Sequence, residues 1–72
     1  MTRYLAIIEE AEGNWSAWLP DVPGCVAAGA TREEALAALG EALAMHLEGL
    51  AEDGLPPPRS SASAEYLAPA GG

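Results

Sequence analysis

Residues 31–52 constrain the fold more than any other part of this chain. Thr31, followed three residues later by Glu34, forms a capping-box pattern, and Glu33 adds a second carboxylate to the first helical turn. Steps of 100° per residue gather one apolar stripe, which consists of Leu36, Leu39, Leu43, His46, Leu47 and Leu50. Gly54 and the prolines at 56–58 end the pattern. The sequence therefore predicts one helix of roughly 33 Å that must bury one face.

Three short apolar segments precede this helix. Residues 4–8, 15–19 and 25–28 have strand character, with turn residues at 10–14 and a Pro- and Gly-rich loop at 20–24 between them. Because 72 residues make at most one domain, we expect an α+β fold of order β-β-β-α, with a small antiparallel-type sheet covered on one face. Residues 1–59 form the predicted domain and 60–72 a tail, in which 64–67 are a candidate edge strand.

A single helix leaves the other face of such a sheet without cover. Alternation along the strands places Leu5, Ile7 and Trp18 on that open face. Small cores are often completed by association, so these residues are the candidate contact face of a homodimer or homotetramer. A different partner protein covering this face is the alternative.

Charge narrows the classes of partner. The chain has 11 acidic residues against three arginines and a formal charge of −8, which disfavours direct binding to DNA, RNA or anionic membranes. The same charge attracts basic proteins. No apolar run is long enough to span a bilayer, no signal sequence follows Met1, and Cys25 is the only cysteine, so we expect a cytoplasmic location.

The residues that could carry chemistry do not form a recognisable catalytic or cofactor set. His46 lies on the leucine stripe and is predicted to be a packed, neutral imidazole, and Cys25 is predicted to be a small buried residue. An alternative is a two-metal nuclease whose ligands are Glu9, Glu10, Asp21 and Glu33, but the spacing of these residues defines no ligand pair. We therefore expect no catalytic residue, metal or cofactor.

One motif is more specific than these patterns. The loop Pro20-Asp21-Val22-Pro23-Gly24-Cys25, followed by Gly29-Ala30-Thr31 and by Glu33-Glu34-Ala35-Leu36, resembles the HicB family of antitoxins. The resemblance extends over about residues 3–58. Its loop residues Pro20, Asp21, Pro23, Gly24 and Cys25 are candidates for a structural or partner-facing role, and Thr31 with Glu34 for the helix N-cap.

The resemblance implies a partial ribonuclease-H-like β-β-β-α-β fold. It also implies a protein without enzymatic activity that binds and neutralises HicA, a small basic mRNA-cleaving toxin with a double-stranded-RNA-binding type of fold. Many members carry a second, DNA-binding domain, for which we expect no room after Arg59. Operator binding is accordingly not expected.

Three functions follow from these observations. The first is an antitoxin that occupies the RNA-binding surface of a HicA-type toxin. The second is a solitary homo-oligomeric HicB-like regulatory or binding module without a toxin. The third, least favoured, is a residual metal-dependent nuclease.

Overall fold

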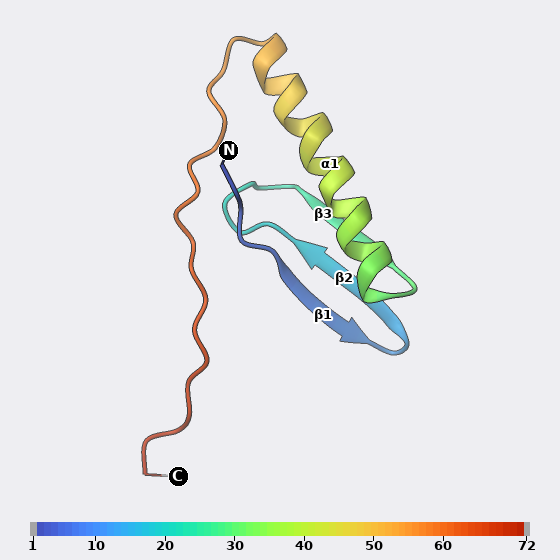
Figure 1. Cartoon of the computed structure of the whole chain (residues 1–72), viewed down its shortest axis with the longest axis vertical. Coiled ribbons are helices and arrows are strands. Elements are labelled where there is room, and N and C mark those ends of the chain that lie inside the picture. The colour runs from blue at the N-terminus through green and yellow to red at the C-terminus, as the bar shows by residue number, and fades with distance from the viewer. Residues whose placement is uncertain (1, 72) are drawn as a thin grey trace.

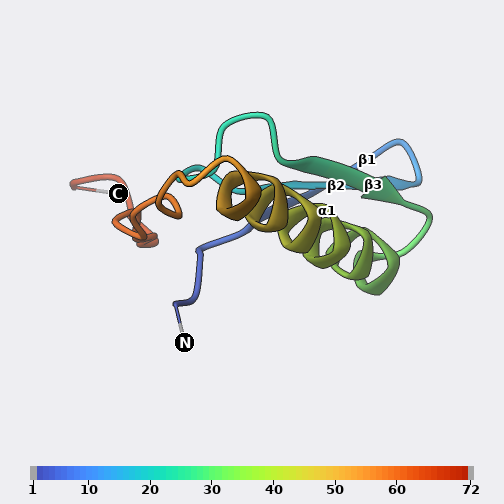
Figure 2. The same ribbon diagram turned by 90° about the horizontal axis from the view of Figure 1, so that it is seen from above.

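The chain forms a three-stranded sheet and one long helix. The computed structural model describes residues 2–71, with β1 at Ile7–Ala11, β2 at Asn14–Trp18, β3 at Val26–Gly29 and α1 at Arg32–Glu52. Both strand pairs are antiparallel, in the order β1-β2-β3 (Figure 1). α1 lies on one face of the sheet (Figure 2). The predicted α+β class, with three strands followed by one long helix, is confirmed.

The first hairpin is tighter than the sequence suggested. Glu12 and Gly13 have φ values of 52° and 78°, and Ala11 pairs with Asn14 on either side of them. Positive φ at both central residues is the signature of a two-residue type I′ turn, whose twist matches the strands. The predicted bounds of the first strand, 4–8, were therefore wrong, because the strand begins at Ile7 and continues through Ala11.

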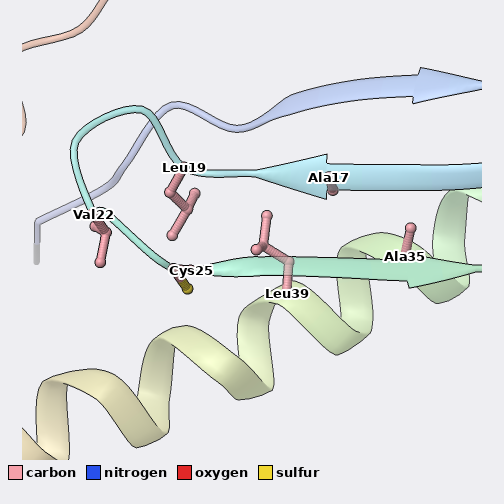
Figure 3. Close-up of a cluster of buried hydrophobic side chains, with 6 residues drawn as sticks. All are labelled: Ala17, Leu19, Val22, Cys25, Ala35 and Leu39. Atoms are coloured by element: carbon pink, nitrogen blue, oxygen red, sulfur yellow. The ribbon is translucent and has the colours of Figure 1, made fainter.

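The core lies between α1, the sheet and the loop that joins β2 to β3. Its buried side chains, shown in Figure 3, are Ala17, Leu19, Val22, Cys25, Ala35 and Leu39. Ala17 and Ala35 are 1% and 0% exposed, and such small side chains allow α1 to pack close to the sheet. Partly buried apolar side chains surround this cluster, among them Ile8, Trp15 and Leu43.

The leucine stripe of α1 is only partly used. Leu39 is its buried member, whereas Leu43 and Leu47 are half-buried and His46 is exposed. A helix of 21 residues is about 32 Å long, and a strand of five residues spans only about 17 Å. The second half of α1 therefore extends past the sheet, so the prediction that His46 is packed in the core was wrong.

Both ends of α1 are capped. Thr31 Oγ1 accepts a hydrogen bond from the backbone N–H of Glu34 at 3.1 Å, and Glu34 Oε2 accepts one from Ala30 N–H at 3.0 Å. At the other end Gly54 has φ 70°, its N–H donates to Ala51 O, and Leu55 N–H donates to Leu50 O. This pair of bonds is a Schellman motif, so the helix ends where Gly54 was expected to stop it.

The segment after α1 runs back along the body of the protein as an extended tail. Tyr4 Oη donates to Pro58 O at 2.6 Å, and Ser60 Oγ donates to Arg3 O. Residues 55–69 contain no regular secondary structure, so the predicted edge strand at 64–67 is absent. The physical reason is spatial, because an open pocket separates residues 64–66 from β1.

Candidate functional site

The motif loop is a compact turn whose apolar side chains point inward. Leu19 N–H donates to Cys25 O at 3.2 Å, Val22 N–H to Leu19 O and Cys25 N–H to Val22 O at 3.1 Å each. Leu19, Val22 and Cys25 are 5%, 0% and 4% exposed and face α1 (Figure 3). The loop therefore closes one end of the core.

The remaining loop residues lie at the surface. Pro20, Pro23 and Gly24 are exposed, and Gly24 has φ 82°, a conformation that few residues other than glycine adopt without strain. The two prolines, whose φ is fixed, flank Asp21 and Val22. This rigidity fixes the direction in which Asp21 projects.

Asp21 binds the C-terminal tail. Its Oδ2 accepts hydrogen bonds from the backbone N–H groups of Ser61 and Ala62, both at 2.8 Å, and its Oδ1 accepts one from Ser61 Oγ at 3.2 Å. The two backbone donors, Ala62 first and then Ser61, lower the pKa of this carboxyl below its ordinary value, because they stabilise the charged form. We call this arrangement the Asp21 clasp.

Sequence reasoning gave Asp21 no such role. The clasp joins residues 40 positions apart, and no local pattern indicates that pairing. The one available signal was Ser60-Ser61-Ala62-Ser63, whose small side chains and hydroxyls suit a segment that donates to a carboxylate. The composition of this segment predicted a linker instead.

The residues weighed for chemistry are not brought together. Cys25 is a buried free thiol, while His46 is exposed on the far half of α1. Glu9, Glu10 and Glu33 are exposed on β1 and at the start of α1, and Asp21 is engaged in the clasp. Within residues 2–71 no three His, Cys, Asp or Glu side chains are placed to hold one metal ion.

The face of the sheet opposite α1 carries an apolar row. Ile7 pairs with Trp18, and Trp18 pairs with Val26, so the three side chains lie side by side across all three strands. Their neighbours Ile8, Ala17 and Ala27 point the other way, into the core. Val26 is 67% exposed, and Ile7 and Trp18 are half-buried. We call Ile7, Trp18 and Val26 the open sheet face.

Val26 is the member of this face that the sequence reasoning missed. Alternation along one strand identified Ile7 and Trp18, but the side of Val26 depends on how the motif loop sets the register of β3. Leu5 lies just before β1 and is half-buried.

The charged side chains on the rest of the surface are mostly acidic. Glu9, Glu10 and Glu12 are exposed in β1 and its turn, and Glu41, Glu48 and Glu52 are exposed along α1. α1 has acidic residues in its first turn and no basic residue in its last. This surface suits a basic protein better than a nucleic acid.

Comparison with known proteins decides the family. A profile described as the HicB-like antitoxin of bacterial toxin–antitoxin systems matches residues 4–70, which is most of the chain. The chain belongs to the HicB-like antitoxin family. The match includes the motif loop, all four secondary-structure elements and most of the tail.

A phage protein is also similar to this HicB-like chain. The uncharacterized 14.9 kDa protein in the rep-hol intergenic region of Haemophilus phage HP1 (strain HP1c1) is 38% identical over 64 residues. The aligned region is 89% of this chain but 48% of the phage protein, so the chain spans about half the length of that relative. No solved structure gives a significant match. The likeness to ribonuclease H therefore stays a prediction.

The helix of this HicB-like protein gives no sign of membrane insertion. α1 is the one helix within residues 2–71, and it is not long and apolar enough to cross a bilayer.

Proposed function

We propose that this HicB-like protein is a non-enzymatic antitoxin that binds a small basic toxin of the HicA type and thereby protects mRNA from cleavage. The family match carries this proposal. The formal charge of −8 supports it, because an acidic protein attracts a basic partner. Because such a toxin acts on mRNA, the proposal places the protein in the cytoplasm.

The proposed mechanism is occupation of the RNA-binding surface. A toxin that binds RNA must present basic side chains to the phosphates. An acidic protein competes with the RNA for these basic side chains. Glu9, Glu10 and Glu12 gather in β1 and its turn at the free end of the hairpin and are exposed. We assign the first electrostatic contact with the toxin to this hairpin end.

A toxin-protection assay tests the function. A purified HicA-type toxin is mixed with the HicB-like protein, and cleavage of a single-stranded RNA is followed with time. We expect cleavage to stop at stoichiometric antitoxin. Undiminished cleavage, with no complex detectable by calorimetry against the HicA-type toxins tried, contradicts the proposal.

Charge reversal tests the mechanism. Glu10→Lys should slow association with the toxin and make the rate less dependent on salt, because steering acts mainly on association. Glu48→Lys is the matched control, since Glu48 is also exposed but lies on the second half of α1. Equal effects of both variants contradict a local contact at the hairpin end.

The open sheet face supports self-association as a second candidate function. It places Ile7, Trp18 and Val26 in one row without cover from α1. A second copy that covers this row gives the homo-oligomer of a solitary HicB-like module. Trp18→Glu should then yield monomers in light scattering, whereas an unchanged mass contradicts this contact.

A further inference from the structure

The tail of this chain is held in place but leaves its own apolar tip exposed. Hydrogen bonds to Tyr4, Arg3 and Asp21 fix Pro58 through Ala62 against the body. Beyond them Tyr66 is 102% and Leu67 is 91% exposed. The radius of gyration is 14.5 Å, whereas a compact chain of this length has about 11 Å. The tail therefore extends away from the body of the protein.

An open pocket lies between the tail and the sheet. Its volume is about 460 Å³, and its walls are Ala6, Ile7, Ile8, Trp15 and Arg32 on one side and Ala64, Glu65 and Tyr66 on the other. We call this pocket the edge slot. The edge slot is open to solvent and borders β1, so a short segment of extended chain can enter it.

The sheet at this point has an unpaired edge. Among residues 2–71, β1 pairs with β2 alone, so its other side offers free backbone donors and acceptors. In a two-residue hairpin the residues next to the turn form a hydrogen-bonded pair, here Ala11 and Asn14, and the pairs alternate from there. Glu10 and Ile8 therefore direct their backbone groups toward the free edge and the edge slot.

We propose that residues 65–67 of a second copy of this chain enter the edge slot and pair with β1, in a reciprocal exchange of tails. In the segment Glu65-Tyr66-Leu67 the two apolar side chains lack cover in the single chain. Ile7, Ile8 and Trp15 supply an apolar wall for them, and Arg32 supplies a guanidinium for Glu65. The same contact covers the β1 edge of both copies.

Chain direction supports exchange between copies over closure of the tail onto its own strand. Ser60 bonds to Arg3, and residues 64–66 lie across the slot from 6–8, so each tail runs parallel to its own β1. A twofold axis perpendicular to the two tails makes them antiparallel to each other, and therefore makes each antiparallel to the other copy's β1. Antiparallel pairing is the more stable ladder. The strand order becomes β1, partner tail, own tail, partner β1, which uses each tail once.

Disulfide formation between single-cysteine variants tests this arrangement. If Tyr66 of one copy lies opposite Ile7 of the other, antiparallel pairing brings Ala64 opposite Glu9, and Ala68 opposite Leu5. An equimolar mixture of Ala64→Cys and Glu9→Cys should oxidise to a mixed dimer, because Cα atoms of cross-strand neighbours fall within disulfide range. Ala68→Cys mixed with Glu9→Cys is the matched control and should give little. The native chain, whose Cys25 is buried, gives the background.

Each outcome of this experiment is decisive. A third sample is one chain that carries both Ala68→Cys and Glu9→Cys. A disulfide confined to this sample, with none in the mixtures, shows parallel closure of the tail onto its own β1 and overturns the exchange. Equal yields from both mixtures show random collision and also overturn it. A monomer at all concentrations, with no disulfide in any sample, does the same.

Three variants that preserve the core give an independent readout. Glu10→Pro removes the outward N–H of β1 that this register places opposite Ser63, next to the segment 65–67, whereas Glu10→Gln removes only the charge. In sedimentation equilibrium we expect Glu10→Pro to weaken the dimer and Glu10→Gln to preserve it. Replacing both Tyr66 and Leu67 by Ser should weaken the dimer at least about tenfold, since two apolar side chains lose their cover. An unchanged dimer in both experiments contradicts the proposal, whatever the protein does to a toxin.

Discussion

One added methyl group should have opposite effects at Gly29 and Gly40. A Cβ at Gly29, the last residue of β3, would lie 2.7 Å from Ala35 N and 2.8 Å from Glu34 Cβ. Neither the backbone nor a capping glutamate can move far, because both belong to the first turn of α1. At Gly40, in the exposed middle of α1, a Cβ would meet nothing within 4 Å.

These distances set the expected changes in the free energy of unfolding. Forcing an extra carbon into a tight contact costs about 1–3 kcal/mol, so Gly29→Ala should destabilise by that amount. Replacing a helical glycine by alanine stabilises by about 0.5–1 kcal/mol, so Gly40→Ala should stabilise. For a domain of this size each kcal/mol shifts Tm by about 4–8 °C.

Thermal and urea unfolding followed by circular dichroism measure the pair. The experiments are run at two protein concentrations, because association shifts the apparent stability. A Gly29→Ala variant as stable as the native protein would refute the close approach of β3 to α1. A Gly40→Ala variant that loses stability would contradict the open space around Gly40.

Three further predictions concern the core, the loop and the Asp21 clasp. Leu39→Ala should cost about 2–5 kcal/mol of unfolding free energy because Leu39 is 3% exposed, whereas Met45→Ala, at a side chain 72% exposed, should change it by less than about 0.5 kcal/mol; similar values in urea titrations would contradict the position of the core. Gly24→Val should cost about 1–3 kcal/mol through its φ of 82°, and Gly24→Asn should cost less, so equal stabilities would refute the backbone argument. The lowered pKa of Asp21 means that the clasp stabilises the tail above the ordinary Asp pKa of about 3.9, and that this stabilisation is lost as the pH falls through the lower value in the folded state. Hydrogen exchange at Ser61 and Ala62 should therefore speed up in acid relative to other exposed amides, and Asp21→Asn should abolish that dependence.

The helix shows how far local sequence information reaches. Thr31, Glu34 and Gly54 act through hydrogen bonds within one or two turns, so their pattern was sufficient to place both ends of α1. His46 shows the limit of the same reasoning. Its position on the apolar stripe was read correctly, but whether the stripe is buried there depends on where the sheet ends.

The predicted bounds of the first hairpin were wrong for a different reason. Polar residues at 10–14 predicted a long turn, and only the positive φ of Glu12 and Gly13 shows that two residues suffice. The shorter turn moved β1 toward the C-terminus by several residues, yet it left Ile7 and Trp18 on the same face, because alternation has a period of two.

The sequence by itself determined the class of the fold, the ends of the helix and the acidic character of the surface, since these depend on neighbours along the chain and on composition. Only the tertiary structure decided that Asp21 holds Ser61 and Ala62, that Val26 completes the open sheet face, and that an open pocket separates the tail from β1. Each of these joins parts of the chain whose relation is set by loop geometry and strand register. Such long-range contacts follow from how the elements pack, and no local pattern of residues encodes them.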